Sequence, residues 1–255
     1  IGPGARPGPL HPPSESSSRA LAVLPFETFC PDESGYDLGG GVHTELVTQL
    51  ARISELQVSG LAAVRRFEGS RLPIREIAAE LGVGSLLTGS VRCTSDRIRV
   101  SVELVDPGTE RIRWAERYDR RRGDLFDIQT GIALSLADEL RAELSGAERV
   151  ALRRPPTRSE EAYEIFLRAA EYHRRPAFDE QDGRAAEQLY RRAIDLDPGF
   201  ALALARLARV HSYFYRVGWD RTPQRFQAWR AASDSAARVA AACHSAAGSG
   251  GCAPA

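Results

Sequence analysis

Three consecutive glycines, Gly39 to Gly41, precede a segment with helical spacing of apolar residues, and His43 follows them. A glycine loop at a helix N-terminus can hold phosphate through its backbone amides. The segment lacks the Lys-Ser/Thr of a P-loop and the spacing of a dinucleotide-binding loop, and no Ser or Cys nucleophile motif accompanies His43. We therefore expect the glycines to be a flexible entry and cap for the helix, and His43 to be a solvated residue of its first turn.

A basic stretch surrounds Trp114 and Tyr118 in the interleaved pattern that is typical of nucleic-acid binding. Its arginines are Arg111, Arg113, Arg117, Arg120, Arg121 and Arg122. Acidic residues interrupt the stretch, and strand-like alternation places Trp114 and Tyr118 on the face opposite Arg113 and Arg117. The pattern favours a solvated strand face with an adjoining loop.

Four cysteines and one DxD motif are the remaining candidates for metal or redox chemistry. The cysteines are Cys30, Cys93, Cys243 and Cys252. They form no CxxC pair and have no ligand-like spacing with the five histidines, which favours buried or incidental thiols over a metal site or a disulfide. Asp195 and Asp197 precede Pro198, so a helix-end role is favoured for them. We expect no catalytic residue, no metal site and no cofactor in this chain.

A dense aromatic set lies near the carboxy terminus. Its members are Tyr213, Phe214, Tyr215, Trp219, Phe226 and Trp229. Such residues fill the core between packed helices, which is the favoured interpretation. The alternative is a peptide-binding surface, because aromatic residues and Arg dominate the binding energy of interfaces.

The elements that would position these residues begin with an alternation of strands and helices. Gly82 is a favourable helix C-cap, Asp106 to Thr109 has turn chemistry, and Asp124 can cap a following helix. The predicted order is strand, helix, strand, helix, three antiparallel strands and a helix, over residues 19–27, 42–53, 56–59, 74–81, 85–118 and 125–144.

Paired prolines within Arg153 to Pro156 end this pattern, since proline cannot continue a helix. We place the boundary there, between a domain at 19–150 and a helical domain at 159–243. The predicted helices of the second domain cover residues 159–174, 183–196, 200–215 and 222–242. Residues 1–18 have the composition of a disordered linker, and the low-complexity residues 244–255 are expected to be a disordered tail.

Length and charge limit the function classes. The 255 residues suffice for one or two domains with a substantial core. A net charge of zero argues against a general nucleic-acid binder, although residues 20–150 carry −5 and residues 151–255 carry +4. No apolar run reaches the roughly 18 residues of a membrane span. Methionine is absent, so we expect a fragment or processed product, with any catalytic domain upstream of Ile1.

The second domain resembles two degenerate tetratricopeptide repeats. One second-helix pattern has small residues where two helices approach, an aromatic residue between them and a closing proline; these are Ala186, Tyr190, Ala193 and Pro198. The first-helix positions of the next repeat are Leu204, Leu207, Ala208 and His211. Because such arrays usually need three or more repeats, we expect this one to lean on the first domain, on missing sequence or on another chain.

Residues 19–145 closely resemble the TolB amino-terminal-like domain, also described as FlgO-like, in five ordered blocks. The blocks are ALAVLPFE, GGGVHTELVTQLARISELQV, IREIAAELGVGSLLTGSVR, RIRVSVELVDPGTERIRWAERYDR and DLFDIQTGIALSLADEL. The resemblance implies a mixed-sheet α/β module without catalytic residues. In that family the module commonly precedes tetratricopeptide repeats in the carboxy-terminal half of bacterial signalling proteins, behind a serine/threonine kinase, an adenylate cyclase or a winged-helix regulator.

The expected fold is therefore an α/β mixed-sheet domain followed by an all-α tetratricopeptide-like helical repeat domain. In such arrays the first helix of each repeat lines a concave groove. The candidate partner-binding residues in this groove are Leu202, Ala205, Arg209, Ser212 and Tyr213. Their mixed apolar and cationic character suits an acidic or amphipathic peptide.

The predicted function is a non-catalytic regulatory module of a bacterial signalling protein. It would bind protein or peptide partners through the repeat groove, or self-associate as a homo-oligomer, and nucleic acid is not an expected partner. The alternative is a fragment of a serine/threonine kinase or an adenylate cyclase whose catalytic domain lies upstream. Both a cytoplasmic location and, if a membrane span precedes residue 1, a periplasmic one stay open.

Overall fold

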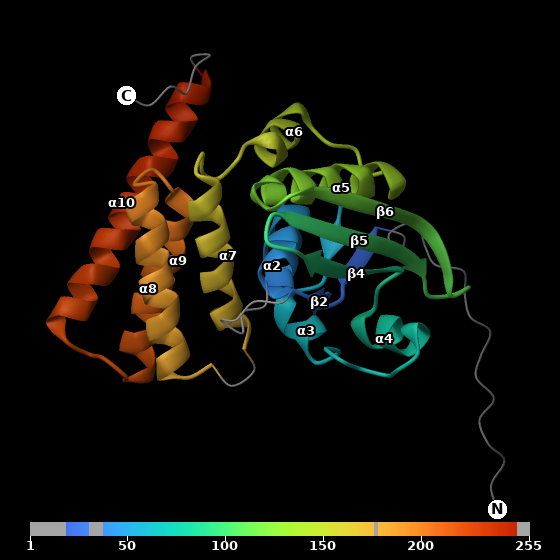
Figure 1. The fold of residues 1–255 in the computed structure, drawn as a ribbon, viewed down its shortest axis with the longest axis horizontal. Helices are drawn as coiled ribbons and strands as arrows, with labels where there is room; N and C mark the ends of the chain where they lie inside the picture. Colours follow the sequence, from blue (N-terminus) through green and yellow to red (C-terminus); the bar gives the residue numbers. More distant parts are fainter. Residues whose placement is uncertain (1–18, 31–37, 176–177, 249–255) are drawn as a thin grey trace, which may run out of the picture.

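The protein folds as a mixed sheet flanked by helices, followed by four helices that pack beside it (Figure 1). This computed structural model describes residues 19–30, 38–175 and 178–248. The expected linker at 1–18 lies outside the described residues. Within the described part, every helix is too short or too polar to cross a membrane.

The sheet is parallel on one side and antiparallel on the other. Its order is β3-β1-β4-β5-β6, and β2 also pairs with β4. The β1–β3, β1–β4 and β2–β4 pairs are parallel, whereas β4–β5 and β5–β6 are antiparallel. The strands are β1 (Ala20–Val23), β2 (Glu27–Phe29), β3 (Gln57–Val58), β4 (Ser85–Cys93), β5 (Arg97–Asp106) and β6 (Arg111–Arg121).

The antiparallel half confirms the predicted alternation. Every second residue of β5 from Ile98 to Leu104 is fully buried, and the residues between them are exposed or half-buried. In the turn to β6, Asp106 Oδ1 accepts hydrogen bonds from the N–H groups of Gly108 and Thr109, at 2.7 and 3.1 Å. This turn chemistry fixes the hairpin.

The strand predicted in the apolar run 19–27, with its end near Pro25, is β1, and a further strand that was not predicted, β2, follows it. Pro25 has no N–H to donate to a ladder, and β1 ends at Val23 while β2 begins at Glu27. Both strands pair in parallel with β4, along successive parts of its length. The Phe26 ring lies over Gly89 of β4, where a Cβ atom would approach it within 2.8 Å. Glycine therefore allows this close packing.

Helices connect the strands and cover the sheet. They are α2 (Leu38–Leu50), α3 (Leu61–Arg65), α4 (Ile74–Leu81), η1 (Arg122–Asp124), α5 (Leu125–Glu139) and α6 (Gly146–Arg153). Gly82 caps α4 with φ 66°, as predicted.

The helix predicted over 125–144 ends early, and a second helix that was not predicted follows it. α5 ends at Glu139, and α6 begins after Ser145. Ser145 Oγ accepts a hydrogen bond from the Glu148 N–H at 3.2 Å, while Glu148 Oε2 accepts one from the Ser145 N–H at 2.8 Å. This capping box starts a new helix where the apolar spacing alone suggests continuity.

Among the described residues after 159 the regular elements are all helices, as predicted. These are α7 (Glu160–Arg174), α8 (Glu180–Leu196), α9 (Ala201–Val217) and α10 (Pro223–Gly248). Each packs against the next, and α7 also packs against α2. Ala186, Tyr190 and Ala193 of α8 are fully buried, as a close helix approach requires. The finer assignment to tetratricopeptide repeats stays a prediction.

The carboxy-terminal tail differs from the expectation in its first residues. α10 continues to Gly248, so disorder from His244 onward is wrong for residues 244–248. The Ala-rich composition supports a helix there because alanine has the best helix propensity. Residues 249–255 lie outside the described residues.

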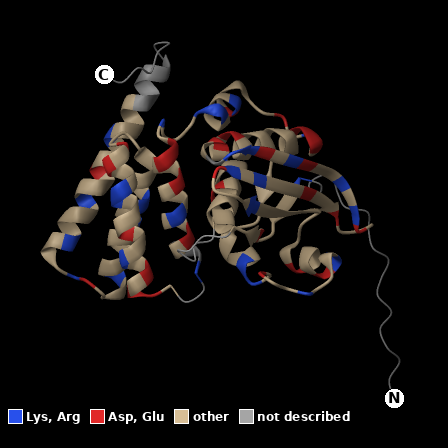
Figure 2. Ribbon diagram, in the orientation of Figure 1, with Lys and Arg blue, Asp and Glu red and all other residues tan. Residues whose placement is uncertain are grey.

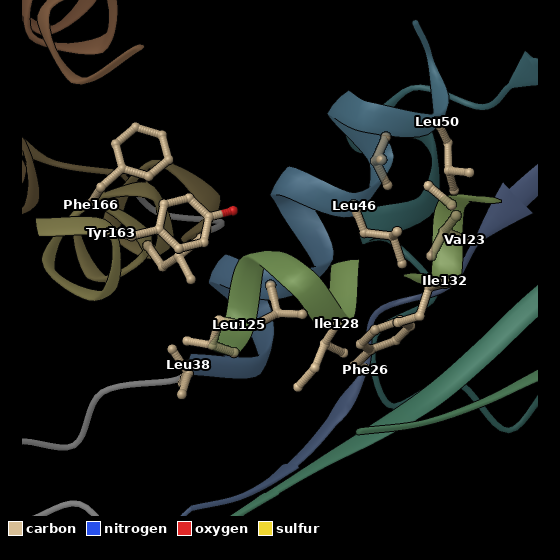
Figure 3. Close-up of a cluster of buried hydrophobic side chains, with 14 of the residues drawn as sticks. Val23, Phe26, Leu38, Leu46, Leu50, Leu125, Ile128, Ile132, Tyr163 and Phe166 are labelled. Atoms are coloured by element: carbon tan, nitrogen blue, oxygen red, sulfur yellow. The ribbon is translucent and has the colours of Figure 1, made fainter. Parts of the chain in front are cut away.

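One hydrophobic core joins the sheet to the helices beside it. Leu46 of α2, Ile128 of α5 and Phe166 of α7 belong to the same buried cluster (Figure 3). A second, smaller cluster lies under α3 and α4 and includes Val64 and Ile77. The helical part thus packs against the α/β part through a continuous hydrophobic core.

Candidate partner-binding site

The five candidate partner-binding residues lie on α9. Ala205 and Arg209 are exposed, and the other three are half-buried. Their spacing gathers them on one side of the helix, while Ala203 and Phe214 on the other side are fully buried.

Tyr213 differs from the other four. Its ring packs against Phe178 and Trp219, with centroids 5.2 and 5.4 Å away. Tyr213 therefore belongs to an aromatic cluster at the end of α9, and the open face of α9 consists of the other four residues.

A pocket of about 550 Å³ opens at one end of this face, where α9 turns into α10. It is lined by Ser212, Tyr215, Arg216, Arg221, Phe226 and Trp229. The Phe226 ring centroid lies 5.8 Å from that of Tyr215 and 5.2 Å from that of Trp229. Ser212 is the only candidate residue that reaches this pocket.

The interpretation that the sequence favours for the aromatic set, core packing rather than the alternative of a peptide-binding surface, does not predict the pocket. That interpretation holds for Phe214, which is fully buried, but is wrong for Tyr215 and Phe226, which are 42% and 39% exposed. A usable signal was their position on either side of the turn between two predicted helices. Residues at such positions become neighbours when the helices pack.

A charged network fixes that turn. Arg225 of α10 forms ion pairs with Glu187 at 2.6 Å and with Asp220 at 2.9 Å. Its Nη1 also lies 2.7 Å from Nδ1 of the buried His211. Gly218, at φ 88°, ends α9. The start of α10 is therefore tied to both α8 and α9.

The charge states in this network follow from its contacts. Hydrogen bonds from Thr222 and Arg225 lower the pKa of Asp220 to about 2. Burial lowers the pKa of His211 to about 4, although Glu187 acts in the opposite direction. At neutral pH the arginine thus meets carboxylates and a neutral imidazole.

The opposite end of the helical part is sealed against the α/β part. A Cβ atom on Gly41 of α2 would lie 2.6 Å from the carbonyl oxygen of Leu167 of α7. Tyr163 of α7 donates a hydrogen bond to Gln129 Oε1, and Gln129 Nε2 donates to the Val42 carbonyl at 3.3 Å. Glycine at position 41 lets the two backbones meet.

A buried ion pair also joins the two parts. Arg206 Nη2 of α9 lies 2.9 Å from Glu45 Oε1 of α2, and Glu45 is 3% exposed. Burial raises the pKa of Glu45, and Arg206 opposes that shift. The pair links the helix that carries the open face to the helix next to the sheet.

The expectation for the glycines and His43 is wrong. α2 begins at Leu38, so Gly39 to Gly41 form its first turn and are buried rather than a flexible entry. His43 is 2% exposed, with Nε2 2.9 Å from the Val23 carbonyl oxygen and its ring edge-on to Phe26. The cause is the packing of α7 and the sheet around α2, which the local sequence does not reveal.

The arginine-rich stretch forms β6, a solvated strand as predicted. Arg113 and Arg117 are exposed, whereas Trp114 and Tyr118 are half-buried. Acidic and basic residues are interspersed along β5 and β6 (Figure 2). Hydrogen bonds from Arg99 and Arg97 lower the pKa of Asp119.

The DxD motif lies at a helix end, as favoured. Asp197 is the C-cap residue of α8, and its Oδ1 accepts a hydrogen bond from the Gly199 N–H at 2.9 Å. Thr157 donates a hydrogen bond to its other oxygen. In the described part of the chain, no group of three or more His, Cys, Asp or Glu residues is placed to hold a metal ion.

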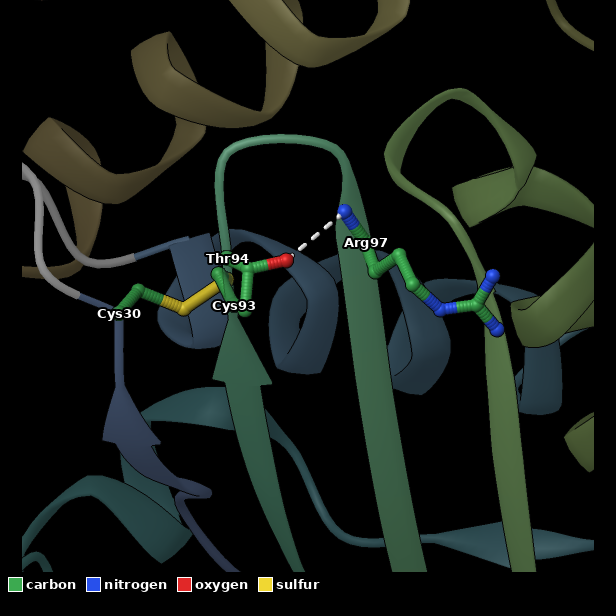
Figure 4. The surroundings of a disulfide bond; sticks show 4 residues. All are labelled: Cys30, Cys93, Thr94 and Arg97. Atoms are coloured by element: carbon green, nitrogen blue, oxygen red, sulfur yellow. Dashed lines mark hydrogen bonds between the residues drawn. A yellow bond between two sulfur atoms is a disulfide. The ribbon is translucent and has the colours of Figure 1, made fainter.

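Cys30 and Cys93 form a disulfide (Figure 4), so the expectation of incidental thiols is wrong for this pair. Phe29, the last residue of β2, aligns with Arg92 of β4, and a cysteine directly follows each of them in the chain. The parallel register, which sequence spacing does not show, brings the two together. The predictions for the Cys243 side chain and for Cys252 concern positions outside the described residues.

Comparisons with known proteins give a family match and one relative by sequence. Residues 17–153, more than half of the chain, match the family described as the HilA/YgeH-like transcriptional regulator, second domain. The relative is a Rhizobium meliloti (strain 1021) protein with the name "Putative adenylate cyclase 3", 31% identical over 200 residues and 78% of this chain. The chain spans 34% of that relative's length.

Solved structures with similarity to this chain include two bacterial proteins. TolB from Acinetobacter baumannii is 16% identical, with a TM-score of 0.34, over 48% of this chain and 28% of that one. Lipoprotein GNA1162 from Neisseria meningitidis is 14% identical, with a TM-score of 0.36, over 47% of this chain and 98% of that one.

Proposed function

This chain belongs to the family of the HilA/YgeH-like transcriptional regulator second domain, and from that premise we propose that it is a non-catalytic regulatory module that binds partner peptides. The matched family is named after a transcriptional regulator, and the Rhizobium meliloti relative is named as an adenylate cyclase. Both names are those of regulatory or signalling proteins. In the proposed function, tetratricopeptide-like helices α7 to α10 hold the partner, and the α/β part supports them.

The open face of α9 is the observation that carries this proposal. Ala205 and Arg209 are exposed although the opposite side of the helix is fully buried. The same face leads into the pocket lined by aromatic residues and arginines. Tyr, Trp and Arg are the residue types that dominate binding energy at protein interfaces.

Binding at α9 has a direct route to the rest of the molecule. Arg206, on the same helix, is paired with the buried Glu45 of α2. α2 in turn packs against α5 and α7 in the shared core. A partner that shifts α9 would therefore act on the α/β part through a fixed ion pair and a packed helix.

Selection from a displayed library of random peptides, about twelve residues long, tests the proposal on the purified chain. We expect Arg209→Glu to weaken the selected peptides about tenfold or more, since an exposed interface arginine can contribute over 1 kcal/mol. Arg192→Glu, an exposed arginine of α8, is the matched control and should have no effect. Unchanged affinity in Arg209→Glu, or no selected peptide, would contradict the proposal.

A second candidate function follows from the Rhizobium meliloti relative. The chain corresponds to about a third of that protein, so the alternative is a regulatory segment of an adenylate cyclase with its catalytic domain upstream of Ile1. A serine/threonine kinase is the other version of this alternative, and the coding sequence upstream of Ile1 would distinguish them. Deleting the matching segment of the relative and measuring cyclic AMP synthesis tests the cyclase role. An unchanged rate and regulation would contradict it.

A further inference from the structure

We infer that the pocket between α9 and α10 binds a peptide segment in which a bulky apolar side chain stands next to a carboxylate. This inference rests on the proposed function and specifies both the binding site and the chemistry of the partner. The pocket lies at the α9–α10 turn, beyond most of the candidate residues on the face of α9.

The apolar wall of the pocket consists of three aromatic rings. Phe226 lies between Tyr215 and Trp229, with ring centroids 5.8 and 5.2 Å away. Tyr215, Val217 and Phe226 all belong to the exposed large hydrophobic residues of the described chain. Removal of apolar surface from water contributes about 25 cal/mol of favourable free energy per Å². An apolar side chain inserted among these rings would therefore be stabilised.

The charge of the pocket comes from arginine alone. Arg216 and Arg221 line it, and no acidic residue does. Arg221 Nε donates a hydrogen bond to the Tyr215 carbonyl oxygen at 3.2 Å, which holds its guanidinium at the pocket. Arg216 is exposed, with its Cζ atom 5.6 Å from the centre of the Tyr213 ring.

Two acidic side chains of the α9–α10 turn network are already paired with another arginine, Arg225. Asp220 and Glu187 both bind Arg225, and Thr222 also donates a hydrogen bond to Asp220, at 2.7 Å. These carboxylates are therefore not available to Arg216 and Arg221. A carboxylate of the partner can neutralise the positive charge of these arginines and accept paired hydrogen bonds from a guanidinium.

The pocket walls are held in place before any partner binds. The Arg225 network joins the start of α10 to α8 and α9, and Gly218 fixes the end of α9. Preformed walls reduce the entropy that is lost on binding. The volume of about 550 Å³ is suited to one large side chain with its neighbouring residues. A peptide segment thus fits this site better than nucleic acid, whose affinity depends on many phosphate contacts.

The test uses the full chain and the same displayed library of random peptides. We expect selected sequences to pair Asp or Glu with an aromatic or large aliphatic residue. Phe226→Ser and Arg216→Glu should each weaken a synthetic copy of the leading peptide about tenfold or more in fluorescence polarisation, whereas Arg192→Glu should not. Replacing the peptide carboxylate by lysine should restore binding to Arg216→Glu, because direct contact allows the charges to be exchanged.

Several other results would overturn this inference. Peptides that are sensitive to Arg209→Glu but not to Arg216→Glu or Phe226→Ser would overturn this inference and leave the proposed function intact. Neutral or basic selected peptides, or no binding at all, would also overturn it, as would tighter binding of a single-stranded oligonucleotide. If Phe226→Ser lowers the thermal midpoint of unfolding, the exposed Arg216→Glu with its lysine exchange still decides the outcome.

Discussion

The two ends of the helical part use similar residue types in opposite ways. Where α7 meets α2, the backbones touch at Gly41, and the arginine of α9 that faces this junction is paired with the buried Glu45. Where α9 turns into α10, two arginines and three aromatic rings surround an open pocket. One end therefore joins the two parts of the protein, whereas the other leaves aromatic and arginine side chains exposed around a pocket. Mutations at the two ends should therefore separate stability from binding.

The largest loss of stability is expected from the disulfide of the α/β part, which lies outside the open pocket. Cys93 belongs to the core, Cys30 packs against it, and 63 positions separate them in the chain. Reduction should lower the free energy of unfolding by about 4 kcal/mol, because the unfolded chain regains the entropy of an open loop. Urea unfolding with and without dithiothreitol measures this. The double variant Cys30→Ser, Cys93→Ser should be insensitive to the reductant, and equal stability of oxidised and reduced protein would refute the expectation.

Removal of Arg206 should cost slightly less. Arg206→Ala leaves Glu45 buried without its partner, and breaking a buried pair costs about 3 kcal/mol. Because the folded-state pKa of Glu45 is already raised, its contribution to stability is present below the unfolded pKa and lost as the pH rises through the folded one. The loss should therefore be larger at pH 8 than at pH 5, which urea unfolding at both values measures.

The exposed pair of Arg75 and Glu110 is the control for that comparison. Its side chains are 61% and 48% exposed, and exposed pairs contribute about 0 to 1 kcal/mol. Arg75→Ala should change stability little at either pH. An Arg206→Ala loss as small as this would mean that the junction is not sealed by the ion pair.

A smaller effect is expected from one added methyl group at the junction. Gly41→Ala places a Cβ atom against the Leu167 carbonyl, and overpacking costs about 1 to 3 kcal/mol. Gly60→Ala is the matched control, since Gly60 has φ −66° and nothing lies within 4 Å of its Cβ position. Thermal unfolding of the two variants compares them, and equal midpoints would show that α2 and α7 can separate without loss.

The smallest effect on stability belongs to the open end. Arg209→Glu and Arg216→Glu change exposed residues, so each should alter the free energy of unfolding by no more than about 0.5 kcal/mol. Circular dichroism during urea unfolding measures this. A loss similar to that of Arg206→Ala would remove the distinction between the two ends.

Local signals in the sequence predicted much of the fold. Alternation identified β5, the glycine at position 82 identified the end of α4, and spacing on α8 identified its buried face. Each of these depends on residues that are close in the chain. The start of α6 also has a local signal, the capping box of Ser145 and Glu148. The apolar spacing continues to Leu144, however, and therefore favoured a single longer helix.

Features that depend on distant partners were not predictable. The disulfide needs the register of β2 on β4, and the burial of His43 needs the sheet and α7 around α2. The open face of α9 followed from helical spacing, whereas the pocket depends on how α10 folds back beside Tyr215. Helical spacing therefore indicated the exposed side of α9 and not the pocket beside it.

The arginine-rich β6 also affects how copies of the protein behave at high concentration. β6 is eleven residues long and lies at the end of the sheet, with β5 as its one partner strand among the described residues. Free N–H and C=O groups along such an edge can pair with a strand of another molecule and start aggregation. Charged side chains on edge strands oppose this pairing. The arginines of β6 thus protect the chain from edge-to-edge association, a benefit that requires no nucleic-acid ligand.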